Sequence, residues 1–179
     1  MSRSLGSLAP AAMATPEPRD ISLEVAGSEV RLRWGPVGDA AEGAPAWELP
    51  SQPDWTNVEA IRLASATFPD GAALAVAALR PRDARGHGDD AVVARFVDAE
   101  GLQIDASEVL VSVEYDAAQR PRRLGIELWP ESDAAPLRIA ADRESEEEYS
   151  AADGREVVRM TFRLDGIGGR GTYETLRQG

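Results

Sequence analysis

Apolar and polar residues alternate with a period of two over most of the chain, which is the pattern of β-strands that bury one face. In ISLEVAGSEVRLRW, residues 21–34, the side chains of Ile21, Leu23 and Val25 share one face, and a short Ala-Gly-Ser segment separates them from a second alternating run. Two such runs around a tight turn predict a β-hairpin. The same alternation predicts further strands in VEAIRLASATF, AVVARFV, VLVSVEY, RRLGIELW and VVRMTFRL. We expect GTYETLR to form the last strand, after the glycine cluster of residues 166–171.

Turn-forming residues separate these runs. Pro69-Asp70-Gly71 precedes AALAVAALR, and Asp98-Ala99-Glu100-Gly101 follows AVVARFV. Proline fixes φ at the first turn position and glycine accepts a positive φ, so both segments predict tight connections between strands. Residues 72–79 are apolar on both faces and alone would also fit a helix. Their place directly after a turn favours a strand that is buried on both sides.

Two segments lack the strand period. Residues 1–19 are dominated by Pro, Ala and Ser, so we expect them to be loosely ordered. Met13 reads as a second start, which leaves open whether residues 1–12 belong to the native protein. Residues 35–55 are rich in Pro, Gly and Ala, and we interpret them as a long connection that serves as a lid, a cover or an insertion. We therefore expect one domain over residues 20–179.

The number and spacing of the strands predict an all-β fold. We count roughly nine or ten short strands, joined in sequence order by Gly, Pro and Asp turns, and we find no convincing long helix. Such a series forms an antiparallel meander, and closing the meander into a barrel removes both exposed sheet edges. We therefore predict a closed or nearly closed lipocalin-like barrel. A two-sheet β-sandwich is the alternative.

The charge balance limits the partners. The chain carries 19 basic and 31 acidic residues, for a net charge of −12. A field of this sign repels phosphate backbones and anionic lipid, so we expect no nucleic-acid partner. The apolar runs are too short for a transmembrane helix, and the N-terminus lacks the apolar core of a signal peptide. We expect a cytoplasmic protein without membrane insertion, and the richness in Ala, Gly, Asp, Glu and Arg indicates a bacterial source.

Several kinds of chemistry are excluded because the chain contains neither cysteine nor lysine. Thiolate zinc sites, cysteine nucleophiles, P-loop lysines and Schiff bases all need one of the two. The single histidine, His87, stands in RPRDARGHGDDAVVARF beside Asp89 and Asp90. Metal sites normally take three or more protein ligands, and adjacent Asp side chains on a strand point to opposite faces. We interpret the stretch as a surface loop and predict no metal and no cofactor.

A barrel would give some of the remaining polar and aromatic residues a role in ligand binding. Tyr115 shares its strand face with valines, whereas Trp129 lies opposite Leu124, Ile126 and Leu128. Aromatic side chains near strand ends either gate a pocket or belong to core and rim packing. Polar residues within strands orient a ligand if they face the interior, and form cross-strand charge pairs if they face solvent. Our candidate ligand-binding residues are Trp34, Arg62, His87, Tyr115, Glu127 and Trp129.

Three segments resemble a known family: ATFPDGAALAVAAL, VSVEYDAAQRPRRLGIELW and VVRMTFRLDGIGGRGTYETLR. Over about residues 55–179 the chain resembles the lipocalin-like β-domains of the carotenoid-hydratase/AttH-like group and related bacterial proteins. Members of that group carry two such barrels in tandem, whereas this chain has room for one. The resemblance implies a barrel able to hold an apolar ligand. Because the family's catalytic acids would lie at a site built by two barrels, we carry over no catalytic residue.

Two functional hypotheses follow. The first is a barrel that binds a small apolar molecule of lipid, isoprenoid or polyketide type, with a cyclase or hydratase activity as a special case, so that enzymatic activity stays open. The second is a non-catalytic interaction or assembly module that uses an exposed sheet face or the acidic segment 142–156, with a homodimer among the options.

Overall fold

The computed structural model describes residues 19–34 and 46–179. Within these ranges the chain forms twelve β-strands and two short 3₁₀ turns, η1 (His87–Asp89) and η2 (Glu146–Glu148). No helix in the described part of the chain is long and apolar enough to cross a membrane. The prediction of loose order covers residues 1–18, which lie outside the described residues, and Arg19, which begins the first strand. The strands are β1 (Arg19–Val25), β2 (Ser28–Trp34), β3 (Ala46–Glu48), β4 (Val58–Thr67), β5 (Ala73–Pro81), β6 (Ala91–Val97), β7 (Gln103–Tyr115), β8 (Pro121–Pro130), β9 (Leu137–Asp142), β10 (Tyr149–Ala152), β11 (Arg155–Leu164) and β12 (Ile167–Leu176).

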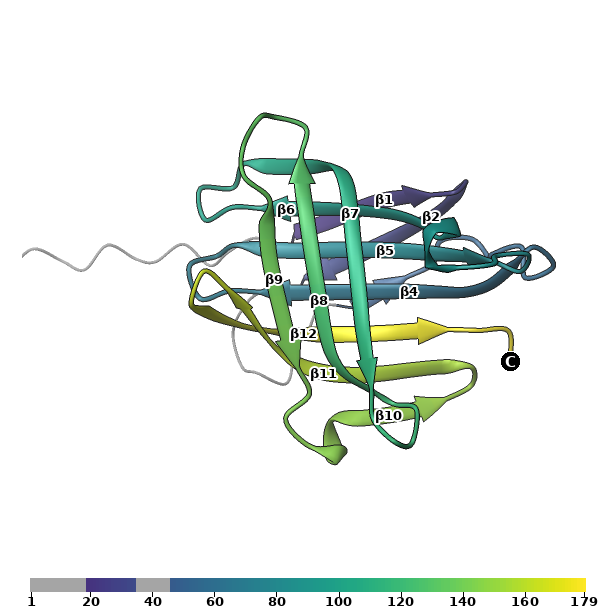
Figure 1. Cartoon of the computed structure of the whole chain (residues 1–179). Helices are drawn as coiled ribbons and strands as arrows, with labels where there is room; N and C mark the ends of the chain where they lie inside the picture. The colour runs from purple at the N-terminus through teal and green to yellow at the C-terminus, as the bar shows by residue number, and fades with distance from the viewer. Residues whose placement is uncertain (1–18, 35–45) are drawn as a thin grey trace, which may run out of the picture.

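Nine of these strands form one antiparallel sheet in the order β10-β11-β12-β4-β5-β6-β7-β8-β9. An additional pairing of β11 with β9 closes this sheet into a barrel of eight strands, with β10 as an outer strand on β11. Figure 1 shows β7, β8 and β9 crossing in front of β4, β5 and β12. The predicted lipocalin-like barrel is confirmed. The β-sandwich alternative does not describe the closed sheet.

The predicted turns explain how the meander folds back on itself. The hairpin of residues 21–34 is β1–β2, with Ala26 and Gly27 at positive φ in its turn. Pro69-Asp70-Gly71 connects β4 to β5, and Gly71 has a φ of 92°. Gly101, at a φ of 86°, lies in the connection from β6 to β7. These glycines adopt a conformation that other residues reach only at a cost.

The barrel interior holds one of two hydrophobic cores. Because side chains alternate across a strand, Leu74 and Val76 of β5 point inward, as do Ile126 of β8 and Phe162 of β11. Tyr173 of β12 joins them, and all five side chains are buried in one cluster. This core fixes which face of every barrel strand lines the interior.

The second core lies outside the barrel. Strands β1, β2 and β3 form a three-stranded cover sheet, and β1 lies against β5 and β6. Leu23 and Leu32 of the cover sheet belong to one buried cluster with Leu63, Ala75 and Ala77 of the barrel. Strand β5 is therefore buried on both faces, as predicted. Within the predicted connection 35–55, Ala46–Glu48 pairs with β2 as β3, and residues 35–45 lie outside the described residues.

Strand β12 differs from the prediction. The glycine cluster of residues 166–171 was expected to precede the last strand, but β12 begins at Ile167 and contains Gly168, Gly169 and Gly171. A Cβ atom on Gly169 would lie 2.7 Å from the Thr67 carbonyl oxygen of β4, and one on Gly171 would overlap the Ser65 carbonyl. The missing side chains let β12 lie close against β4, which pairs with it over Ile61–Thr67.

Candidate functional site

A cavity of about 810 Å³ reaches into the barrel interior. Cavities of this size hold drug-sized ligands, whose pockets span about 300–1,000 Å³. Its apolar wall is continuous with the interior core, because the same side chains belong to both. These shared residues are Ala64, Val76, Val92, Val109, Val111, Ile126, Ile139 and Tyr173. The lining also includes Arg62, Ala78, Gly88, Asp90, Glu108, Leu110, Ser112, Gly125, Glu127, Arg138, Ala140 and Arg163.

Three polar residues on the inner side of the wall, Arg62, Asp90 and Tyr173, form what we call the polar end of the cavity. The Arg62 guanidinium forms an ion pair with Asp90, and Nη1 of Arg80 donates a hydrogen bond to Oδ1 of Asp90 at 3.1 Å. The Asp90 side chain is only 5% exposed. The two guanidinium groups balance the negative charge of this buried carboxylate, and loss of either arginine would leave that charge less well balanced.

Tyr173 contributes a hydroxyl group without a partner. Its side chain is 2% exposed, and no group in the described part of the chain accepts or donates a hydrogen bond at the hydroxyl. Burial, together with Tyr115, raises the pKa of Tyr173 to about 12, although Arg62 and Thr175 lie near enough to act in the opposite direction. The phenol is therefore neutral at physiological pH and can donate a hydrogen bond. Buried polar groups of this kind are normally satisfied, so this hydroxyl calls for a partner.

The loop around His87 contributes to the cavity lining. It connects β5 to β6, and Gly88 and Asp90 belong to the cavity lining. Asp89 accepts hydrogen bonds from the backbone N–H groups of Arg85 and Gly86, at 2.7 and 3.2 Å, and so closes the loop on itself. Asp89 thus binds the backbone of its own loop, whereas Asp90 binds the guanidinium groups of Arg62 and Arg80. Within the described residues no group of three or more His, Cys, Asp or Glu side chains could hold a metal ion.

The six candidate residues from the sequence have different positions. Arg62 and Glu127 line the cavity, but Glu127 belongs to the outer face of β8 and pairs with Arg138 of β9 at 3.3 Å. Tyr115 and Trp129 are exposed and lie outside the cavity lining. Trp34 ends β2 in the cover sheet and His87 begins η1, and both side chains lie outside what the structure describes. For all six residues, ligand binding stays a prediction.

Sequence reasoning missed two members of the polar end. Asp90 was grouped with His87, although its spacing from Val92, Ala94 and Phe96 matches the inward face of β6. No sequence pattern marked Tyr173 as a site residue. Its signal was weak because the pairing of β12 with β4, which brings Tyr173 opposite Ala64, joins residues more than one hundred positions apart.

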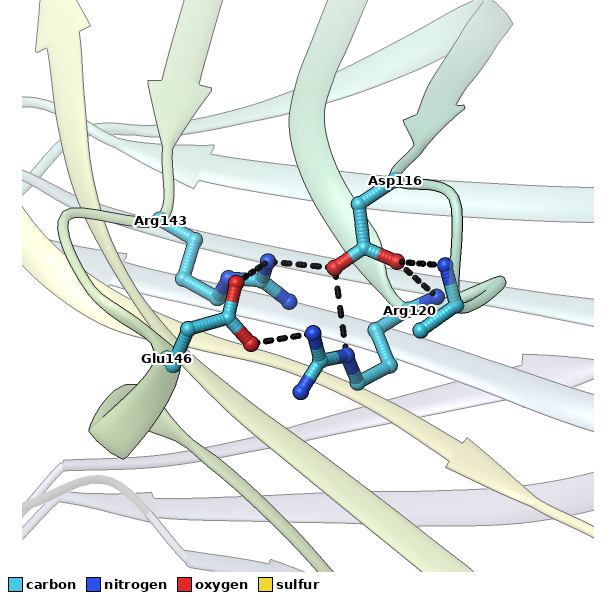
Figure 2. Close-up of polar contacts among 5 residues, drawn as sticks. Asp116, Arg120, Arg143 and Glu146 are labelled. Carbon is cyan, nitrogen blue, oxygen red and sulfur yellow. Dashed lines mark hydrogen bonds and ion pairs between the residues drawn. The ribbon is translucent and has the colours of Figure 1, made fainter.

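A second polar cluster lies outside the cavity lining, between the β7–β8 turn and the segment that runs from the end of β9 into η2 (Figure 2). Asp116 accepts hydrogen bonds from the backbone N–H of Arg120 at 2.9 Å and from Nη2 of Arg143 at 2.6 Å. Glu146 accepts a hydrogen bond from the same Arg143 nitrogen at 3.1 Å and forms an ion pair with Arg120. The hydrogen bond from Arg143, followed by that from the Arg120 backbone, lowers the pKa of Asp116 to about 2. We interpret these four residues as a structural clamp.

This clamp also bears on the acidic segment 142–156. Five carboxylates of this segment are engaged within the molecule, those of Asp142, Glu144, Glu146, Glu148 and Glu156. Asp142 pairs with Arg123 and Arg163, and Glu148 pairs with Arg159 at 3.1 Å. The observed ion pairs give no support to an acidic docking site in this segment.

Comparison with known proteins identifies the fold alone. No protein-family model and no curated protein matches the chain. The chain is similar to the crystal structure of a "putative AttH" from Nitrosomonas europaea, with a TM-score of 0.52 and 18% sequence identity. The match covers 83% of this chain and 49% of that protein, so the chain spans about half its length. The resemblance to AttH-like barrels, inferred from the sequence, is confirmed at the level of fold.

Proposed function

We propose that the protein binds a small, largely apolar molecule inside the barrel. The observation that carries this proposal is the cavity of about 810 Å³, whose lining includes eight apolar or aromatic side chains of the interior cluster and whose inner polar groups converge at one end. An apolar wall with a few convergent polar groups is the usual composition of a ligand site. Lipid, isoprenoid and polyketide-like molecules are the classes we favour.

The alanine residues of the wall support this proposal. Ala64 and Ala78 are buried inner-face residues of β4 and β5, and both line the cavity. Larger side chains at these positions would occupy the space that a ligand needs. The wall therefore offers a direct way to test binding without changing any charge.

The test is a titration with N-phenyl-1-naphthylamine, a neutral dye whose fluorescence rises in apolar cavities. We expect saturable binding at one site of the wild-type protein, and a loss of at least about tenfold in affinity for Ala78→Leu, because the added carbons take up space beside Arg62 that a ligand needs. Ala134→Leu, in the exposed β8–β9 loop, is the matched control and should bind as the wild type does. Absence of saturable binding, or equal binding by Ala78→Leu, would refute the proposal. Mass spectrometry of the recovered ligand would detect a cyclase or hydratase product.

An assembly role is the second candidate function. Leu110 of β7 and Trp129 of β8 are exposed by 51% and 39%, and the strand register makes them diagonal neighbours on the outer face of the barrel. Exposed apolar patches of sufficient size mark interaction surfaces. Light scattering after size exclusion tests this role: a dimer that dissociates in Leu110→Ser would support it, and a wild-type monomer would exclude a stable homodimer.

A further inference from the structure

The polar end of the cavity has more hydrogen-bond donors than acceptors. Asp90 supplies the two carboxylate oxygens, and these are occupied by Arg62 and Arg80. Arg62 carries five N–H donors, of which the contacts within the described residues engage Nη2. Tyr173 adds one neutral O–H. Donors therefore remain at this end after Asp90 has been satisfied.

Tyr173 cannot find its acceptor in Arg62, because a guanidinium group only donates hydrogen bonds. The other polar neighbour that affects its pKa, Thr175, does not reach hydrogen-bonding geometry with the phenol oxygen. The hydroxyl is buried and belongs to the cavity wall. It thus presents an unused donor at the place where a ligand would lie.

We propose that the ligand carries an oxygen acceptor, a carboxylate or a carbonyl, which accepts hydrogen bonds from Tyr173 and Arg62. This inference rests on the proposed function and narrows its ligand from any apolar molecule to one with a polar head and an apolar body. The body packs against the wall formed by Val76, Val109 and Ile126. A pure hydrocarbon would desolvate the polar end and leave the Tyr173 hydroxyl unpaired.

Charge alone does not decide between carboxylate and carbonyl. Arg62 and Arg80 face Asp90 inside, and Nε of Arg80 also donates to Glu59 at the rim, at 3.2 Å. Two cations and two anions sum to zero. Both heads carry an oxygen that accepts hydrogen bonds. They differ in the negative charge of the carboxylate, and an experiment can use this difference to distinguish them.

Three probes with the same phenylhexyl body isolate the head: 6-phenylhexanoic acid, its methyl ester and hexylbenzene. Each is measured by displacement of N-phenyl-1-naphthylamine. A site built to pair with a polar group discriminates against an analogue that lacks it. We expect the acid or the ester to bind at least about tenfold more tightly than hexylbenzene.

Tyr173→Phe should remove most of this preference, whereas its affinity for hexylbenzene and the dye should be at least that of the wild type, because neither probe pairs with the hydroxyl. The melting temperature of the ligand-free variant should stay the same or rise, because an unpaired buried hydroxyl is removed. A merely structural tyrosine would instead lose stability on this change. Tyr149→Phe, in β10 and outside the cavity lining, is the matched control and should preserve the preference for the head.

The acid and the ester distinguish the two heads. If the ligand head is a carboxylate, Arg62→Met should weaken the acid more than the ester. If it is a neutral carbonyl, both probes should weaken equally. The double variant Arg62→Met with Asp90→Asn removes both charges of this ion pair. It replaces Arg62→Met in the comparison of acid and ester if the single variant does not fold.

The outcomes separate this inference from the proposed function. If the dye binds and Ala78→Leu weakens its binding as expected, but Tyr173→Phe keeps the full preference for acid and ester, the inference is wrong and the proposed function stands. If neither the dye nor any probe binds the wild-type protein, the proposed function itself is wrong.

Discussion

Gly171 is the glycine at which an added Cβ atom should lower the free energy of unfolding most. Its Cβ would overlap the Ser65 carbonyl of β4 and lie 2.8 Å from Cα of Ala66, and backbone atoms cannot move aside as a flexible side chain can. We predict that Gly171→Ala lowers the free energy of unfolding by about 3 kcal/mol, at the upper end of the range for overpacking. Urea denaturation gives the measurement.

Gly168→Ala provides the control for this prediction. Gly168 lies in the same strand, but a Cβ atom there has no neighbour within 4 Å. Its effect should stay within about 0.5 kcal/mol, as for ordinary surface changes. Equal stabilities of the two variants would show that β12 can move away from β4.

Tyr173 should make the stability of the protein depend on alkaline pH. Its pKa is about 12 in the folded chain, against 10.0 ordinarily, so between these values the unfolded chain loses the phenolic proton first. Stability should therefore be complete below pH 10 and decline from pH 10 to 12, by at most about 1.4 kcal/mol per pH unit. The measurement is the difference in unfolding free energy between wild type and Tyr173→Phe. A difference that does not change with pH over this range would contradict the assignment.

At the level of elements, the clamp connects two chain segments that no strand pairing joins. Asp116 lies in the β7–β8 turn and Arg143 follows β9, and the Arg143 side chain is only 4% exposed. Because the pKa of Asp116 falls from 3.8 to about 2 on folding, its contribution to stability is complete above pH 3.8 and is lost as the pH falls towards 2.

We therefore predict that Asp116→Asn lowers stability at pH 7 and flattens the loss of stability in acid. Circular dichroism melts from pH 2 to 7 test this. Asp133→Asn, an exposed residue of the β8–β9 loop, is the matched control and should follow the wild-type profile. A wild-type acid profile in Asp116→Asn would mean that the clamp contributes nothing.

Most elements could be predicted because turn chemistry and alternation act over short distances. The hairpin of residues 21–34 and the turn at Pro69-Asp70-Gly71 are examples. β3 and β10 were missed because three and four residues are too few to show a period. The start of β12 was misjudged because glycine normally ends a strand, whereas here it permits a close approach.

The candidate site was harder to predict, because alternation separates two faces without saying which one is inside. Glu127 and Arg62 could equally have lined the interior, and only the strand pairing places Arg62 inward and Glu127 on the outer face. The hydroxyl of Tyr173 became visible as an unused donor only once its surroundings were known. Whether this hydroxyl has a hydrogen-bond partner depends on residues that are distant in the sequence, and the local pattern does not show it.

For the molecule as a whole, the two sides of the barrel differ. The β1–β3 sheet covers the outer faces of β5 and β6, and a second core fills the space between. The opposite wall of β7, β8 and β9 bears ion pairs such as Glu127–Arg138 and Asp142–Arg123 instead. These pairs place opposite charges side by side on neighbouring strands, which stabilises the strand pairing on this wall.

The place of β12 in the barrel has a consequence for folding. β12 pairs with β11 on one side and with β4 on the other, and the contact between Ser65 and Thr172 closes a loop of 107 residues. Folds dominated by such distant contacts form slowly, in about milliseconds to seconds. During synthesis, β4 and β11 keep open edges until β12 has left the ribosome, and open edges invite pairing with other chains. The nascent protein thus stays exposed to aggregation until β12 has paired with both strands.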